Sequence, residues 1–157
     1  MPFGLSSPKF RDHGEIPSAY TAEGSDTSPP LVWSDEPPGT KSYALVVDDP
    51  DAPDPAAPKR TWVHWVVYDL PKDVHELPEG ASGRLPGAAR EGKNDWGAAH
   101  WGGPNPPKGR HRYFFKLYAL DTELPPLDGA TKKDLERAMD GHVLAKAELV
   151  GTYEKRR

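Results

Sequence analysis

The sequence predicts a mainly β protein, with one domain over residues 1–157 folded as an antiparallel β-sandwich of Greek-key type and one short helical segment near the C-terminus. Three stretches of strand length, residues 43–47, 63–70 and 113–120, are rich in aromatic and β-branched side chains. The chain holds 19 prolines and 15 glycines, residues that favour the turns expected between these stretches. Short strands that alternate with irregular turns are typical of a sandwich.

The helical segment is predicted to begin at Thr131. Thr131 followed by Asp134 matches a capping box, in which the two side chains satisfy backbone N–H groups at the start of a helix. Leu135, Ala138, Met139 and His142 then recur at helical spacing, which predicts an apolar stripe that packs on the sheet. Gly141 is expected to break or kink the helix, and residues 148–153 are expected to form a last strand.

Composition restricts the class of protein. The 20 Lys and Arg side chains face 24 Asp and Glu side chains, giving a net charge of -4, so no overall field attracts nucleic acid or an anionic membrane. The absence of cysteine excludes disulfides and thiolate chemistry. No stretch approaches the ~18 apolar residues of a membrane span, and residues 1–10 do not resemble a signal peptide. We therefore expect a cytoplasmic protein with no nucleic-acid partner and no integral membrane association.

Titratable residues gather in two separated parts of the sequence. One comprises residues 48–53 with residues 62–65 behind them, and the other comprises residues 106–113. Each part joins a bend rich in Pro or Gly to histidine or carboxylate side chains at the edge of an apolar strand. We expect the two parts to converge in one pocket for a small ligand.

Strand alternation assigns faces to these residues. His111 and Tyr113 lie two residues apart and should project together, whereas Arg112 should point to the opposite face, where a structural salt bridge is expected. The same rule places His64 on the face opposite Trp65, and we expect Trp65 to be a core residue.

The order and spacing of these segments resemble the phosphatidylethanolamine-binding protein family, in the short bacterial and archaeal form often called Raf-kinase-inhibitor-like. The matching segments are spread over nearly the whole chain, at residues 28–33, 49–53, 62–65, 109–113 and 151–153. The resemblance implies a protein that binds phosphate or a phosphomonoester headgroup and has a regulatory or signalling role.

The resemblance also implies roles for individual residues. His64 and His111 would donate hydrogen bonds to a phosphate-like oxyanion, although an isolated histidine at a strand start is more often structural. Asp49 would orient the ligand and select zwitterionic or partly protonated ligands. Backbone N–H groups around Gly102 and Gly103 are expected to reach the anion. The remaining predicted ligand-binding residues are Asp51, which could equally be a turn carboxylate, Pro53, Trp62, Pro107 and Tyr113.

Other chemistries have weaker support in the sequence. No His-Glu-x-x-His or similar spacing indicates a metal, no Gly-x-Ser-x-Gly motif indicates a serine nucleophile, and no glycine-rich loop indicates a nucleotide. We therefore expect no metal, no cofactor and no catalytic turnover. Two alternatives stay open, namely a hydrolase that uses the Asp and His residues and an inhibitor of kinases or proteases that acts through surface loops. The expected partners are a small anionic ligand, a protein kinase or protease, and a second copy of the chain in a homodimer.

Overall fold

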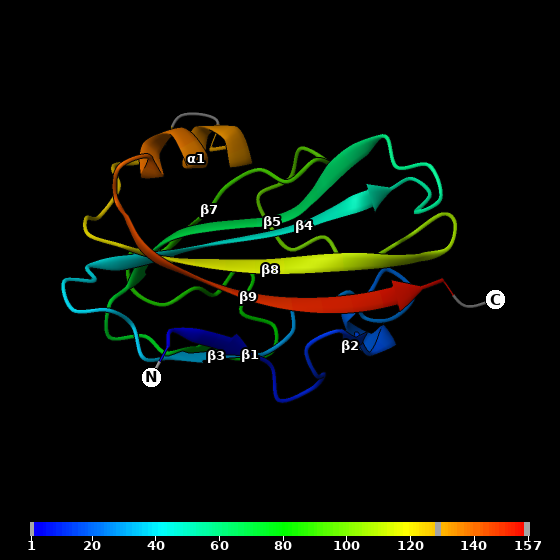
Figure 1. The fold of residues 1–157 in the computed structure, drawn as a ribbon, viewed down its shortest axis with the longest axis horizontal. Helices are drawn as coiled ribbons and strands as arrows, with labels where there is room; N and C mark the ends of the chain where they lie inside the picture. The colour runs from blue at the N-terminus through cyan, green and yellow to red at the C-terminus, as the bar shows by residue number, and fades with distance from the viewer. Residues whose placement is uncertain (1, 128–129, 156–157) are drawn as a thin grey trace.

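A six-stranded sheet forms the larger part of the computed structural model, which describes residues 2–127 and 130–155. Its strand order is β2-β9-β8-β4-β5-β7. The four long strands at its centre lie side by side, and each is antiparallel to its neighbour (Figure 1). The prediction of a mainly β fold is confirmed. The long strands are β4 (Ser42–Ala52), β5 (Arg60–Pro71), β8 (Arg110–Leu120) and β9 (Val143–Glu154), and the short edge strands are β2 (Gly14–Glu15), which runs parallel to β9, and β7 (Arg90–Glu91).

A smaller sheet packs against one face of the large one. Its three strands are antiparallel in the order β1-β3-β6, and a short 3-10 helix precedes β3 in the chain. The two sheets bury a common apolar cluster between them, which is the packing that a sandwich requires. The Greek-key connectivity and the single domain stay predictions. The elements are β1 (Gly4–Ser6), β3 (Leu31–Ser34), β6 (Glu76–Leu77) and η1 (Ser18–Tyr20).

Strand β4 is buried on both faces. Leu45 and Val47 belong to the cluster between the sheets, while Ala44 and Val46 belong to a second cluster on the opposite face. The second cluster is covered by α1 (Lys132–Met139), which appears above the sheet in Figure 1. This burial on both faces explains why residues 43–47 form a continuous apolar run and do not alternate between apolar and polar side chains.

Helix α1 begins as the capping box predicts. The Thr131 hydroxyl accepts a hydrogen bond from the Asp134 N–H at 3.2 Å, and the Asp134 carboxylate accepts one from the Thr131 N–H at 3.1 Å. The helix ends at Met139, and Gly141 follows with a φ of 82°. Strand β9 then starts at Val143, earlier than the sequence indicated. Among the described residues, no helix has the length and apolar character needed to cross a membrane.

A β-bulge interrupts the alternation of β5. Val47 pairs with Trp65, but the next residue of β4, Asp48, pairs with Val63, so His64 is an extra residue in the ladder. The bulge turns the His64 ring toward Tyr113, whose side chain faces the same core as Trp65. The expectation that His64 faces away from Trp65 is therefore wrong, because it assumed a regular strand.

Gly151 allows β9 to pass close to the N-terminal segment. A Cβ atom at this position would lie 2.5 Å from Ile16 Cγ1 and 2.9 Å from Phe10 Cε2, well inside van der Waals contact. We expect Gly151→Ala to lower the free energy of unfolding by about 1–3 kcal/mol through overpacking, as measured by urea denaturation. Gly4→Ala is the matched control, because its Cβ would meet its nearest neighbour at 3.9 Å. Equal stability of the two variants would contradict this packing.

Candidate functional site

A cavity of about 260 Å³ opens where the ends of β4, β5 and β8 meet two loops. Backbone pairing between β4 and β8 ends at Asp48 and Phe114. Beyond that point the two strands are joined through side chains, and the cavity lies beside these contacts. Its lining contains Asp49, Ala52, Pro53, Arg60, Trp62, His64, Trp96, Asn105, Pro106, Pro107, His111 and Tyr113.

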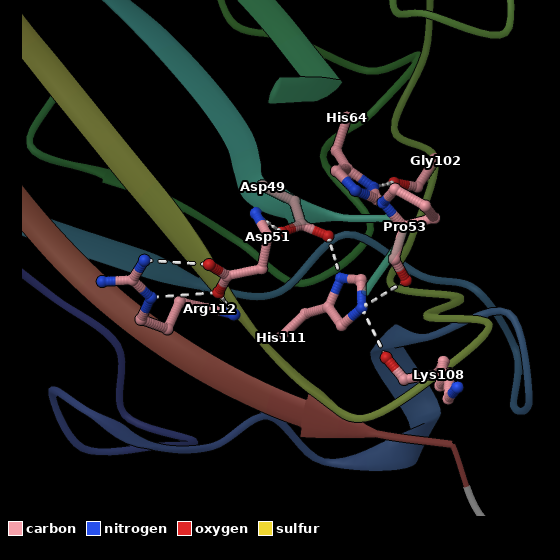
Figure 2. Close-up of polar contacts among 8 residues, drawn as sticks. All are labelled: Asp49, Asp51, Pro53, His64, Gly102, Lys108, His111 and Arg112. Carbon is pink, nitrogen blue, oxygen red and sulfur yellow. Dashed lines mark hydrogen bonds and ion pairs between the residues drawn. The ribbon is translucent and has the colours of Figure 1, made fainter. Parts of the chain in front are cut away.

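His111 lies at the centre of these contacts and is 0% exposed. Its Nδ1 is 2.5 Å from Asp49 Oδ2, and its Nε2 lies 2.8 Å from the Lys108 carbonyl and 3.1 Å from the Pro53 carbonyl (Figure 2). Carbonyl oxygens only accept hydrogen bonds, so Nε2 carries a proton and donates it to them. Both ring nitrogens are thus engaged, which favours a positioning role for His111 instead of the expected donation to an oxyanion.

Asp49 is the partner that His111 holds in place. Its Oδ1 accepts a hydrogen bond from the Asp51 N–H at 2.8 Å, so both carboxylate oxygens are engaged. Burial raises the pKa of Asp49, against the opposing effect of the hydrogen bonds from His111 and from the backbone N–H of Asp51. The contact between Asp49 and His111 therefore satisfies one carboxylate oxygen and one ring nitrogen inside the protein.

His64 is a neutral imidazole in this site. Its Nδ1 is 2.7 Å from the Gly102 carbonyl, so Nδ1 is the protonated nitrogen (Figure 2). Burial lowers the pKa of His64 to about 4, which leaves Nε2 as a lone-pair acceptor at neutral pH. The ring packs edge-on against Trp96 and Tyr113, with centroids 5.1 Å away in each case.

Two buried donors of the cavity lining have no hydrogen-bond partner among the described residues. They are the hydroxyl of Tyr113 and the indole Nε1 of Trp62. Burial raises the pKa of Tyr113, and the charges of Asp49 and Asp51 raise it further, so the hydroxyl keeps its proton and can donate it. A buried donor without a partner costs about 1–3 kcal/mol, which a ligand oxygen in the cavity would recover.

Asp51 is placed away from the cavity lining. It accepts hydrogen bonds from the Arg112 backbone N–H at 2.9 Å, from Nε at 3.0 Å and from Nη2 at 2.8 Å (Figure 2). These hydrogen bonds lower the pKa of Asp51 and keep it charged. The expected salt bridge of Arg112 is confirmed, and the contacts of Asp51 favour its structural interpretation over ligand binding.

Gly103 also lies outside the lining of this cavity. Its N–H donates to Asp26 Oδ1 at 2.7 Å, and the Gly102 N–H donates to the His64 carbonyl at 3.1 Å. The expectation that these N–H groups reach an anion does not hold in this structure, because both are already used to hold neighbouring segments.

Arg60 and Asn105 line the cavity without having been predicted. Arg60 could have been found, because it lies two residues before Trp62 on the same strand and alternation gives the two a common face. Trp96 lines the cavity as well, on a loop that Asn94 orders by accepting hydrogen bonds from the N–H groups of residues 96 and 98. No sequence signal identifies Asn105.

Within residues 2–127 and 130–155, no group of three or more His, Asp or Glu side chains is arranged to hold a metal ion.

The lowered pKa of His64 should appear in the acid stability of the protein. Below the unfolded-state pKa of ~6.5 the unfolded chain binds a proton that the folded state resists, so stability is lost as pH falls from ~6.5 toward 4. We expect the free energy of unfolding, measured by urea denaturation, to fall between pH 7 and 4.5 by about 2–3 kcal/mol more in the wild type than in His64→Gln. Parallel pH profiles would contradict a buried neutral histidine.

Comparisons with known proteins agree with this fold. Residues 6–154 match the family model described as phosphatidylethanolamine-binding protein. A UPF0098 protein of Methanothermobacter thermautotrophicus is 48% identical over 153 residues, which cover 96% of this chain and 98% of that protein.

Solved structures show the same relationship. A crystal structure of a phosphatidylethanolamine-binding protein homologue from Chlamydia trachomatis superposes with a TM-score of 0.91 at 43% identity, over 99% of both chains. Escherichia coli YbcL, described as a member of the mammalian family, superposes with a TM-score of 0.89 at 36% identity, over 99% of this chain and 100% of that one. The chain therefore belongs to the phosphatidylethanolamine-binding protein family.

Proposed function

We propose that the cavity binds a small phosphate-like anion, either phosphate or a phosphomonoester headgroup, in its monoanionic form. The observation that carries the proposal is the pair of buried donors, Tyr113 Oη and Trp62 Nε1, that have no partner among the described residues. Oxyanion oxygens accept hydrogen bonds from such donors, and they bind strongly because the acceptor is charged. Arg60, on the exposed side of the cavity, supplies the positive charge among the lining residues.

The size of the cavity favours a small ligand. Its volume of about 260 Å³ lies just below the ~300–1,000 Å³ that is usual for small-molecule pockets. A phosphate or a short headgroup suits this space better than an acyl chain does. Pro53, Pro106 and Pro107 contribute stiff walls, which lowers the entropy lost when a ligand is bound.

The protonation state of the site selects the form of the anion. Neutral His64 presents an unprotonated Nε2, and Asp49 adds a carboxyl group to the same lining. A phosphomonoester dianion has no P–OH group and would place only negative oxygens against these acceptors, whereas its monoanion can donate a P–OH proton to one of them. The preference for a partly protonated ligand thus follows from acceptors as well as donors.

The same contacts favour binding without turnover. A hydrolase needs a nucleophile beside an effective general base, but His111 has both nitrogens engaged and Asp49 has both oxygens engaged. His64 keeps a free Nε2, but its pKa, lowered to about 4, makes it a weak base. Among the described residues that line the cavity there is no Ser, Thr or Lys side chain. Prolonged incubation with ethyl phosphate should therefore release no inorganic phosphate. Inhibition of a kinase or protease, a regulatory role, a homodimer and a cytoplasmic location stay predictions.

Removal of the Tyr113 hydroxyl tests the proposal directly. Hydrogen bonds to charged groups contribute ~1.5–3 kcal/mol, so Tyr113→Phe should weaken the binding of ethyl phosphate by about tenfold or more in titration calorimetry. Stability should not fall, because the hydroxyl has no partner to lose among the described residues. Tyr118→Phe, on the face toward α1, is the control and should bind like the wild type. Unchanged affinity in Tyr113→Phe would remove the main support for the site.

The pH dependence of binding follows from the proposed monoanion. A phosphomonoester loses its second proton near pH ~6, and His64 stays neutral from pH 5 to 8, so affinity for ethyl phosphate should fall by up to about tenfold per pH unit above ~6. Sulfate, which cannot supply a proton in this range, should bind poorly throughout. In His64→Gln the decline should be shallower, because the amide can donate to a dianion. Affinity that rises with pH in the wild type would show that the site prefers the dianion.

A further inference from the structure

The edge strand β7 ends at Glu91, whose carboxylate accepts three hydrogen bonds. The Trp65 indole and the Ser82 hydroxyl both donate to Oε2 at 2.7 Å. The Gly83 N–H donates to Oε1, also at 2.7 Å. Glu91 is not among the residues that line the cavity. Any influence of this carboxylate on a ligand must therefore pass through the groups that it holds.

Ser82 extends the contacts of Glu91 to another segment of the chain. A hydroxyl has one proton to donate and two lone pairs that accept. The Ser82 proton is used for Glu91, and its oxygen accepts the Trp101 N–H at 2.8 Å. The carboxylate at the end of this chain strengthens it, because hydrogen bonds to a charged acceptor are stronger than neutral ones.

The two tryptophans tied to Glu91 flank one contact of the cavity. Trp65 follows His64 in the sequence, Trp101 precedes Gly102, and the two indoles pack edge-on with centroids 5.5 Å apart. Between them, His64 Nδ1 donates to the Gly102 carbonyl at 2.7 Å (Figure 2). The Gly102 N–H donates back to the His64 carbonyl at 3.1 Å. Glu91 thus ties together the two segments whose separation sets this pair of hydrogen bonds.

The contact with Gly102 determines what His64 offers to a ligand. A neutral imidazole carries its proton on either Nδ1 or Nε2, and the partner of one nitrogen decides the state of the other. The Gly102 carbonyl selects the Nδ1–H form, which leaves Nε2 as an acceptor. If this carbonyl moved away, the Nε2–H form would become accessible, and His64 would present a donor in place of an acceptor.

We propose that Glu91 is a positioning residue that fixes the tautomer of His64. It acts through Ser82 and Trp101, which hold the Gly102 carbonyl where the Nδ1 proton can reach it. The control of the tautomer rests on these contacts alone, whereas its effect on the choice of ligand rests on the proposed function.

The test observes the His64 nitrogens without any ligand. In nitrogen NMR at neutral pH, the wild type should show a protonated Nδ1 and an unprotonated Nε2. Ser82→Ala breaks the link to Trp101, and Glu91→Met removes the acceptor at similar side-chain length. Each should raise the ratio of the Nε2–H to the Nδ1–H form by about two- to tenfold, the range that one hydrogen bond supports.

Glu91→Gln is the conservative variant. Its amide oxygen can still accept from Trp65 and Ser82, while the Gly83 N–H, whose hydrogen bond is exposed, can turn to water. This variant should therefore keep the wild-type His64 signals, as a positioning role requires.

Ser42→Ala is the matched control for Ser82→Ala. The Ser42 hydroxyl also bonds to the backbone, donating to the Thr122 carbonyl at 2.6 Å, but it lies at the start of β4, whereas the cavity lies at the other end of that strand. Its loss should leave the His64 signals unchanged. The inference is overturned if Ser82→Ala keeps the wild-type signals, or if Ser42→Ala changes them to the same extent.

A second measurement compares ethyl phosphate with sulfate at pH 6 by titration calorimetry. An Nε2–H group can donate to sulfate, so the preference for ethyl phosphate over sulfate should shrink by about two- to tenfold in Ser82→Ala. An unchanged preference, with the NMR change present, would overturn the link between the His64 tautomer and the choice of ligand. If the NMR change appears while ethyl phosphate fails to bind the wild type, the positioning role stands and the proposed anion site fails.

Discussion

The hydrogen bond between Asp49 and His111 holds the site together, because it joins β4 to β8 where their backbone pairing has stopped. The same imidazole contacts the carbonyls of Pro53 and Lys108, so one buried ring fixes two loops that border the cavity. The neighbouring contact between Asp51 and Arg112 closes the gap on the outer side. Strands that diverge around side-chain contacts leave a space between them, and this space is the cavity.

Carboxylates outside the cavity lining are paired with cationic side chains. Asp51 is paired with Arg112, and Asp48, pointing to the other face of the sheet, is paired with Lys116 and Lys132. Burial of an unpaired charge is costly, which explains why these carboxylates have fixed counter-ions. The lining keeps His64 neutral and Tyr113 protonated. A site of this kind selects ligands by the placement of donors and acceptors more than by net charge.

Trp96 forms a wall of the cavity and is held in place by several contacts. It packs edge-on against Trp62 and His64, with ring centroids 5.4 and 5.1 Å away, and a Cβ atom on Gly102 would lie 2.5 Å from its Cζ3. Its loop is held by hydrogen bonds to the side chain of Asn94, so the indole is positioned by backbone contacts as well as by packing.

Local rules of sequence determined the strand content, the capping box of α1, the core position of Trp65 and the grouping of His111 with Tyr113, because each depends on neighbours a few residues away. Tertiary contacts decided the rest of the site. The bulge that turns His64 into the cavity comes from the register between β4 and β5, and Asp51 is drawn out of the lining by Arg112, a residue distant in sequence. The Gly103 N–H is taken by Asp26 from a third segment. Periodicity within one strand carries no information about such partners, so the sequence indicated segments that meet at the site, while the fold decided which of their residues line the cavity and which atoms stay free for a ligand.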